Sequence, residues 1–400
     1  MRSHPDRLRT TAWFGVIVGL LACFVALPPI EARGPVWPVV IGLVALTVGI
    51  GSFIRGERRI GSYAIAAGVL GMLVGYLATR SSIGNLEAVV VWSALFASTL
   101  RFATPLIFAS LGGLFSERSG VVNIGLEGMM LMGAFFAVWG ADVTGTWTLG
   151  LLIGILAGGA AALVHAFFAI TLRADQIVGG TAINFLALGL TSYLYIDVYG
   201  TEGTPTDLST IPKVELGFLE RIPVLGHFLF DPASGMLGDA SAMIWAALAM
   251  VFVTYVVVFT TPIGLRLRAV GEQPRAADTV GINVYAMRYG AVTLSGMLAA
   301  CGGAYISLGF VNGFGQNLIA GRGFIALAAL IFGNWRPVGA AAACLLFGFS
   351  SALARSMQEY STSIATLFEA LPYVLTLIAV AGVIGRSIPP AAVGRPYRKQ

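Results

Sequence analysis

The chain has 400 residues, of which 57% are hydrophobic and only 11% are charged. Soluble globular domains carry roughly 25% charged residues, so this composition excludes an ordinary soluble protein and indicates a membrane protein with many spans. The formal net charge is +5, but the basic residues lie at the ends of apolar blocks and form no cluster, which disfavours nucleic acid as a partner.

The apolar residues fall into blocks that suit helices crossing a bilayer, for which about 20 residues at a rise of about 1.5 Å each are needed. In chain order the blocks cover about 11–28, 36–54, 60–79, 86–115, 124–141, 147–172, 176–199, 239–261, 286–311, 318–333, 337–354 and 367–385. We therefore predict an all-α fold, a polytopic helical bundle of the inner membrane with about 10–12 transmembrane segments, some of them short or broken.

The first block follows a basic stretch and could be mistaken for a signal peptide. Pro28, Pro29 and Glu31 follow it and offer no cleavage site with small residues, so we interpret it as a retained anchor. We expect residues 1–59 to form an N-terminal extension with two transmembrane segments, followed by the main core over residues 60–385.

The orientation follows from the basic residues, which concentrate in the joints on the cytoplasmic side of membrane proteins. With a cytoplasmic N-terminus, most of the 24 Lys and Arg residues fall in the inner joints. Both termini are then expected to be cytoplasmic, and residues 386–400 would form a basic cytoplasmic tail.

A polar turn rich in glycine, residues 116–128, precedes the hydrophobic run 129–141; we call it the central turn. It carries Glu127, and an acid at the centre of a membrane helix costs about 2.5–3.5 kcal/mol, so we expect this carboxylate to have partners. Asn123 is placed to cap the following helix, which would put Glu127 at the fourth helical position, where the positive helix end favours an anion.

Two connections are longer than simple turns. Residues 200–239 face outward on our count and are polar, mildly acidic and rich in proline, which fits a solvated external loop or a landing surface for an extracytoplasmic partner. Residues 261–288 face the cytoplasm, where Pro274 suits the first position of a short helix and Gly281 its end. This helix either docks in a groove of another protein or belongs to a passive loop.

The later region contains a short apolar segment, residues 324–332, between two turns that contain glycine. It resembles residues 109–128 in outline but shares almost no identity with them, so a true internal repeat is not supported. Short segments interrupted by glycine in both halves of a transporter point to a path near the bilayer midplane.

Several kinds of chemistry have no support. The two lysines, Lys213 and Lys399, do not follow glycine, so no Walker A nucleotide site exists, and the cysteines and histidines lack metal-ligand spacing. We expect no cofactor, no metal and no catalysis, and we interpret His165 as a helix-packing residue.

The scarcity of ionisable groups inside the blocks argues against a carrier coupled to protons or sodium. Neutral polar side chains suit an uncharged heterocyclic or hydroxyl-rich solute, although each can equally be a cap or an interhelical bond: Asn123, Thr181, Asn184, Asn312, Gln316, Asn317 and Asn334.

Three stretches resemble a known family. Residues 112–130, with Gly-Leu-Phe-Ser-Glu-Arg-Ser-Gly-Val-Val-Asn-Ile-Gly-Leu-Glu-Gly at 113–128, look like the signature of permease subunits in bacterial ABC importers of the branched-chain amino acid and simple-sugar (ribose-type) class, closest to the nucleoside-transporter-like subgroup. Residues 264–278 resemble its cytoplasmic coupling loop, and residues 323–339 its late signature. The resemblance covers about residues 86–385. Residues 1–59 depart from it, because members of this subgroup commonly lack the first two segments.

The resemblance implies a multi-pass subunit of the bacterial cytoplasmic (inner) membrane that translocates nucleosides, purine nucleosides in our first hypothesis, and is no enzyme. It implies as partners cytoplasmic ATP-binding subunits, a second permease chain that is homologous and not identical, and an extracytoplasmic solute-binding protein or lipoprotein, besides membrane lipid. We place the solute path near 102–141, 176–199 and 318–354, with the path residues Asn123, Glu127, Asn184, Asn312 and Asn334. ATPase coupling is expected at Arg266, Arg268, Glu272, Pro274, Arg275 and Asp278. The alternatives are a simple sugar as solute, a self-contained ion-coupled or facilitative carrier, and a scaffold that does not transport.

Overall fold

The computed structural model describes residues 4–26, 36–80, 92–214, 237, 240–358, 366, 369–370, 373 and 388–398. Within these ranges the regular structure is helical, and the only strand-like pairing is an isolated bridge between Lys213 and Ser241. The prediction of an all-α fold is confirmed. Most of the predicted external loop, residues 215–236, and most of the last block, residues 367–385, lie outside the described residues.

Eight described helices are long and apolar enough to cross a membrane. They are α2 (Val36–Ile54), α5 (Trp92–Arg118), α6 (Leu126–Thr144), α7 (Trp147–Ala166), α8 (Gln176–Tyr199), α10 (Ala242–Thr260), α13 (Val284–Tyr305) and α15 (Pro337–Gln358). The π-helical turns η1 (Phe167–Thr171) and η3 (Ile306–Val311) extend α7 and α13. The remaining helices are α1 (His4–Ala26), α3 (Arg58–Arg80), α11 (Pro262–Glu272), α12 (Pro274–Thr279) and α14 (Arg322–Phe332). This arrangement confirms a polytopic helical bundle.

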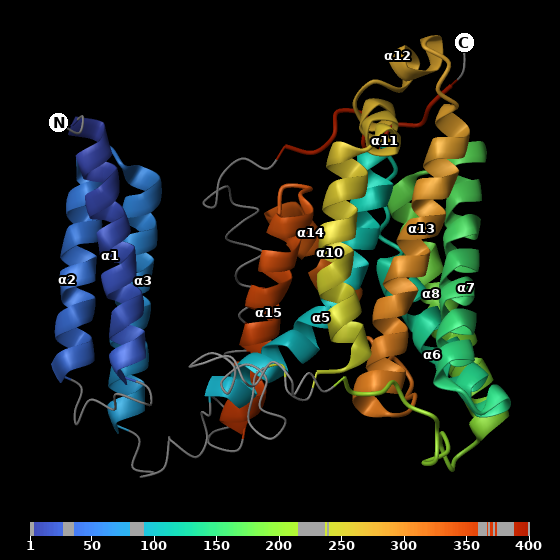
Figure 1. The fold of residues 1–400 in the computed structure, drawn as a ribbon, viewed down its shortest axis with the longest axis horizontal. Helices are drawn as coiled ribbons and strands as arrows, with labels where there is room; N and C mark the ends of the chain where they lie inside the picture. Colours follow the sequence, from blue (N-terminus) through green and yellow to red (C-terminus); the bar gives the residue numbers. More distant parts are fainter. Residues whose placement is uncertain are drawn as a thin grey trace. The chain divides into compact units, whose positions relative to one another are not determined.

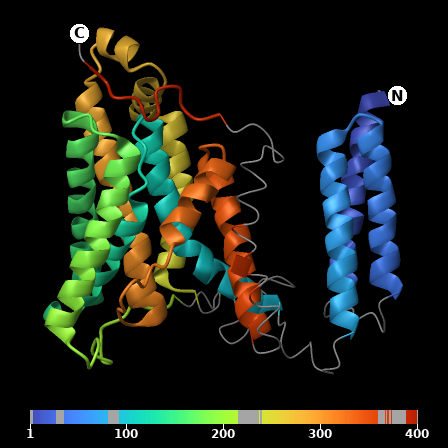
Figure 2. The same cartoon turned by 180° about the vertical axis from the view of Figure 1, so that it is seen from behind.

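The chain divides into two compact units, which we describe separately. The first consists mainly of residues 1–95, and in it α1, α2 and α3 pack on one another as a three-helix bundle (Figure 2). Small residues allow close approach: a Cβ added at Gly19 would lie 2.7 Å from Ala67, and one at Gly49 would lie 2.7 Å from the Ile65 nitrogen. The third apolar block therefore packs with the first two in this unit.

The second unit consists mainly of residues 96–354, with residues 386–400. At its centre lies α6, which packs against α7, α8, α13 and α14 and is largely buried. Backbones approach closely here as well, because a Cβ added at Gly158 would meet Ala300 and one at Gly154 would lie 2.9 Å from the Cβ of Ala137. Gly154 and Gly158, four residues apart on α7, thus let neighbouring helices approach closely.

Helix α14 is too short to cross a bilayer, because its 11 residues rise only about 16 Å where about 30 Å is needed. It begins after Gly321, which has a φ of +85°, and ends at Gly333. Asn334 and Trp335 then adopt left-handed conformations, with φ of 52° each, before Pro337 starts α15. The predicted short segment between two glycine turns is therefore a half-length helix.

One end of the second unit carries α11, α12 and residues 388–398, and we call it the α12 end (Figure 1). Helix α5 ends there, and α13 begins there. The central turn follows α5 and leads into α6.

Candidate functional site

Side-chain hydrogen bonds to the backbone organise the central turn. Ser116 Oγ donates to the Val121 carbonyl at 2.8 Å, and Ser119 Oγ donates to the Ser116 carbonyl at 2.6 Å. Gly120 has a φ of +93°, which favours glycine, and a Cβ added there would lie 2.8 Å from the Arg288 guanidinium. The serines and the glycine of this motif thus reverse the chain within a few residues of the end of α5.

Helix α6 begins at Leu126, with Gly125 as its N-cap and no side-chain cap. The prediction that Asn123 caps this helix is wrong, because the first intrahelical carbonyl is that of Gly125, which lies two residues later. Glu127 is accordingly the second residue of the helix and not the fourth. Asn123 is fully buried and donates from Nδ2 to Ser295 Oγ on α13 at 2.9 Å.

Glu127 binds the start of the half-length helix. Its Oε1 accepts from the Gly321 N–H at 2.7 Å, and its Oε2 accepts from the Gly323 N–H at 2.6 Å. The first N–H groups of a helix have no partner within the helix, and its positive end favours an anion. A Cβ added at Gly323 would lie 2.5 Å from the Glu127 Cα, so glycine is needed for this approach. The carboxylate therefore has hydrogen-bond partners that offset the free energy cost of placing an acid in the membrane.

Asn184 attaches α8 to the start of α6. Its Oδ1 accepts from the Gly128 N–H at 2.8 Å, and its Nδ2 donates to the Ile124 carbonyl at 3.0 Å. A Cβ added at Gly180, one helical turn earlier, would lie 2.9 Å from the Gly125 nitrogen. Asn184 and Gly180 thus hold the backbone of the central turn against α8.

Two further side chains hold Val122 of the central turn. Gln176 Oε1 accepts from the Val122 N–H at 2.7 Å, and His165 Nε2 lies 3.0 Å from the Val122 carbonyl. His165 is fully buried, as a helix-packing residue would be. The sequence contained no signal for Gln176 or for Ser295, since neither stands in a motif.

The remaining two path candidates lie elsewhere. Asn312 follows η3 with a φ of 57° and is exposed. Asn334 lies after α14, and its Oδ1 accepts from the Ile388 N–H at 2.9 Å. The structure thus brings Asn123, Glu127 and Asn184 together around the start of α6, and it does not bring Asn312 or Asn334 to that place.

A second cluster joins the end of α5 to the turn after α14. Trp335 Nε1 donates to Glu117 Oε2 at 2.5 Å, and Arg118 donates to the Trp335 carbonyl from Nε at 3.1 Å and Nη2 at 2.8 Å. The guanidinium carbons of Arg118 and Arg268 lie 5.5 and 5.2 Å from the Phe259 ring centroid. Sequence reasoning missed these contacts, although Glu117, Arg118 and Trp335 all stand in the quoted motifs.

The coupling candidates lie on two short helices at the α12 end. Thr261 Oγ1 accepts from the Gly264 N–H at 3.2 Å and caps α11, which sequence analysis did not predict. Pro274 begins α12, and Gly281, with a φ of +85°, follows its end, as predicted. The coupling candidates on the two helices differ in exposure: Arg266, Glu272 and Arg275 are exposed, whereas Arg268, Pro274 and Asp278 are partly buried.

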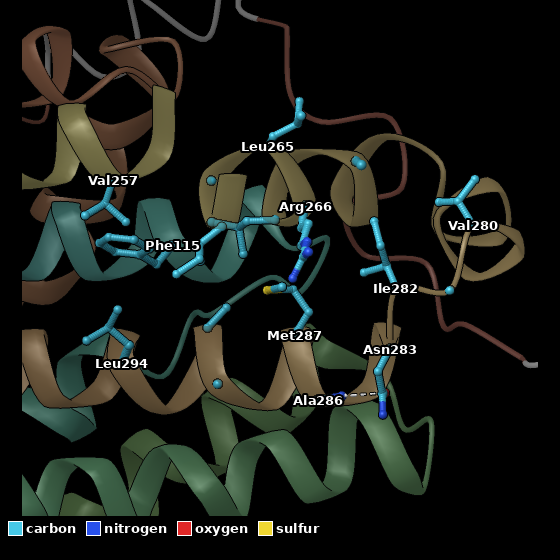
Figure 3. A pocket seen from close by; sticks show the side chains of 17 residues that line it. Phe115, Val257, Leu265, Arg266, Val280, Ile282, Asn283, Ala286, Met287 and Leu294 are labelled. Carbon is cyan, nitrogen blue, oxygen red and sulfur yellow. Dashed lines mark hydrogen bonds between the residues drawn. The ribbon is translucent and has the colours of Figure 1, made fainter. Parts of the chain in front are cut away.

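A groove of about 860 Å³ runs between α11 and α13 (Figure 3). Phe115, Val257 and Leu294 line its inner part, and Arg266 points into it from α11. None of the five path candidates lines this groove. Among the described residues, no group of three or more His, Cys, Asp or Glu side chains is arranged to hold a metal ion.

The membrane-crossing helices form a bundle, a half-length helix begins at a partly buried acid, and short helices project at one end. These features define a multi-pass membrane protein with the architecture of a transporter. Residues 95–380 match the family of permease components of branched-chain amino acid transport systems, and the chain belongs to this family. It is accordingly a permease of the cytoplasmic membrane.

Several curated relatives match over most of their length. The guanosine ABC transporter permease NupQ of Bacillus subtilis is 43% identical over 78% of this chain and 99% of its own. The nucleoside ABC transporter permease NupC of Lactococcus lactis is 41% identical over 76% and 96%, and a putative glucose ABC transporter permease of Haloferax volcanii, TsgC13, is 35% identical over 68% and 80%. The same two bacteria contribute a more distant permease each, NupP at 28% and NupB at 22% identity. No solved structure matches the chain.

Proposed function

We propose that this chain is the membrane-spanning permease subunit of an ATP-driven importer of nucleosides. The observation that carries the proposal is the 43% and 41% identity to a guanosine permease and a nucleoside permease, each matched over nearly its whole length. The relative named for glucose is less similar, so nucleosides take precedence over sugars as the solute. Energy comes from partner ATPase subunits, because the sequence has no Walker A motif.

The solute path is proposed to run beside the start of α14. Half-length helices whose ends meet inside the membrane are the usual sites of substrate binding in transporters. Here the polar atoms of Glu127 and Asn184 are engaged by the protein's own backbone. These two side chains are therefore proposed to form a structural hinge that connects α14 and α8 at the inner end of the path. In this proposal they do not bind the solute directly.

ATPase coupling is assigned to α11 and α12. Helix α12 projects from the second unit, and its Arg275 is exposed. Val280, which follows the helix, is 75% exposed. A short helix that presents a charge and an apolar side chain suits a groove on another protein. The proposed partners are cytoplasmic ATP-binding subunits, which would move α12 when they close on ATP.

Two further partners complete the proposed importer. A second permease chain is supported by the two bacteria that each contribute two permeases to the relatives of this chain. An extracytoplasmic solute-binding protein or lipoprotein would deliver the nucleoside at the outer face. The C-terminal residues 388–398 are then cytoplasmic, since the α12 end carries them and must face the ATPase. The distribution of Lys and Arg along the sequence supports the same side for the N-terminus.

The test is uptake of labelled guanosine into liposomes that contain the permease with its ATPase, second permease and binding protein. We expect uptake that requires ATP and the binding protein and that unlabelled nucleosides inhibit more strongly than unlabelled glucose. Transport by this chain alone without nucleotide would establish an ion-coupled or facilitative carrier instead, and inhibition by glucose alone would establish a sugar importer. Absence of any uptake with all partners present would favour the scaffold.

Coupling is tested by replacing Arg275-Ala276-Ala277-Asp278 with a Gly/Ser linker of equal length. The replacement removes four of the six residues of α12 and leaves the membrane helices unchanged. We expect the variant to reach the membrane at the normal level and to lose co-purification of the ATPase. Retained co-purification together with normal uptake would show that α12 is a passive loop.

A further inference from the structure

Residues 388–398 run across the α12 end of the second unit. In both Figure 1 and Figure 2 this stretch crosses the end that carries α11 and α12. Its backbone bonds directly to the unit, because the Ala392 N–H donates to the Gly271 carbonyl at 2.9 Å and the Gly394 N–H donates to the Gly120 carbonyl at 3.2 Å. The first bond reaches α11 and the second reaches the central turn.

Side chains of the unit bind the same stretch at both ends. Near its start, Glu272 Oε2 on α11 accepts from the Ala391 N–H at 3.1 Å, and Asn334 binds the Ile388 N–H as described above. Further on, Arg288 on α13 donates from Nη1 to the Arg395 carbonyl at 3.2 Å. Arg288 also donates from Nε to the Ser119 carbonyl at 3.1 Å, so one buried guanidinium joins the stretch to the central turn.

Tyr397 anchors the stretch beneath α12. Its side chain is 6% exposed and packs in a small apolar cluster with Val270, Ala277 and Val284. Its ring centroid lies 5.5 Å from that of Tyr285, and its hydroxyl donates to Asp278 Oδ2 at 2.8 Å. Burial and the hydrogen bond to Asp278 raise the pKa of Tyr397 to about 12, so the phenol stays protonated and remains a donor at neutral pH.

Helix α12 depends on such support. It has only six residues, and a helix of that length is not stable by itself in water, because the first turn costs more conformational entropy than its hydrogen bonds return. Ala277 is its one buried residue, and it lies in the cluster to which Tyr397 belongs. The contacts of Tyr397 are therefore a large part of what holds α12 in place.

We propose that residues 388–397 are a positioning strap that ties α12 to the central turn and to the turn after α14, with Tyr397 as the positioning residue for α12. The strap makes one mechanical unit of the coupling helix, the turn that leads into Glu127, and the end of the half-length helix. A displacement of α12 by the ATPase then reaches both sides of the path instead of being absorbed by a flexible loop. The proposal rests on the proposed function for the source of that displacement.

Three variants of the full chain test the strap. Tyr397→Phe removes the hydrogen bond to Asp278 and keeps the ring, Tyr397→Ala removes both, and Arg398→Ala is the control because the neighbouring Arg398 is exposed. The first measurement is hydrogen–deuterium exchange of residues 274–279 in the purified protein, which requires no transport. We expect faster exchange of α12 in Tyr397→Ala, a smaller increase in Tyr397→Phe and none in Arg398→Ala.

The second measurement is nucleoside transported per ATP hydrolysed in the complete complex. We expect Tyr397→Ala to weaken ATPase binding only in part, because Arg275 and Val280 remain available for docking, while transport per ATP hydrolysed falls several-fold, with Tyr397→Phe between it and the wild type. A general folding defect in Tyr397→Ala would instead lower ATPase binding in parallel with uptake. In that case the strap is judged from Tyr397→Phe, which keeps the ring and removes only the hydrogen bond to Asp278. Unchanged α12 exchange in both Tyr397 variants would overturn the strap. A wild-type complex that does not couple nucleoside uptake to ATP hydrolysis would overturn the proposed function. The strap would still be tested in that case by the hydrogen–deuterium exchange of residues 274–279.

Discussion

At the scale of single residues, the acid inside the membrane is explained by the helix that it binds. Glu127 binds the start of α14. Two backbone N–H groups and the positive helix end there replace the water that a carboxylate loses on burial. Asn123 shows the reverse, since its Oδ1 is buried without a hydrogen-bond partner while its Nδ2 is bonded. The polar side chains of the central turn thus differ in how fully the protein satisfies them.

The first prediction concerns the charge at position 127. In Glu127→Gln one carboxylate oxygen becomes an NH₂ group, which cannot accept from a glycine N–H, so one charge-assisted bond is lost at about 1.5–3 kcal/mol. We expect assembly with the ATPase to be retained, the melting temperature in detergent to fall and uptake to decrease. Glu202→Gln, at an exposed glutamate, is the control. Unchanged uptake would reduce Glu127 to an acid at a helix start without a role in the path.

The second prediction concerns the glycine that meets this acid. Gly323→Ala would place a Cβ 2.5 Å from the backbone nitrogen and Cα of Glu127, neither of which can turn aside. We expect the variant to be destabilised by about 1–3 kcal/mol, as for other overpacked sites, and to lose most uptake. Gly315→Ala is the matched control, because a Cβ there would have no atom within 4 Å. Equal thermal stability of the two variants would contradict the close approach.

At the scale of elements, three helices bond to the central turn and the start of α6. Helix α8 contributes Asn184 and Gln176, α7 contributes His165, and α13 contributes Ser295. Each bond reaches a backbone or side-chain atom that no regular helix would satisfy, so these elements and the turn are expected to move together. A turn held from three sides can pass a displacement on to α6 and α8.

The third prediction tests the bond between α8 and the turn. Asn184→Leu has a similar volume but leaves the Gly128 N–H and the Ile124 carbonyl without their partner, at about 1–3 kcal/mol for a buried group. We expect a lower melting temperature and reduced uptake with ATPase binding unchanged. Thr181→Val, one turn earlier on α8, is the control, because Thr181 Oγ1 bonds only to the Ile177 carbonyl of its own helix among the bonds found. An Asn184→Leu protein as stable and active as the control would exclude a role for this bond.

At the scale of the whole molecule, the family match and the second compact unit begin at neighbouring residues. The family match begins at residue 95, and the second compact unit begins at residue 96. The relative NupQ is matched over 99% of its length by 78% of this chain, so about a fifth of this chain has no counterpart there. The bundle of α1, α2 and α3 lies outside the residues 95–380 that match the family.

The fourth prediction follows from that division. A variant that starts at residue 92 keeps α5 and all later helices, because the first three helices pack on one another. We expect it to co-purify with the ATPase and to transport nucleoside within about twofold of the full chain, since no bond of the central turn involves residues 4–80 among those described. Loss of ATPase binding in this variant would show that the N-terminal bundle serves assembly.

The sequence by itself determined the helical class, the positions of most membrane segments, the half-length helix, the short helix α12 and the family. These properties are local: hydropathy adds up residue by residue, and proline and glycine mark helix ends through their own backbone preferences. The tertiary structure decided the partners: Glu127 binds residues 194 and 196 positions away, Trp335 reaches Glu117 across 218, and Tyr397 reaches Asp278 across 119. A hydrogen bond between distant residues leaves no period or spacing in the chain, because it depends only on which backbones the packed helices bring within about 3 Å of each other.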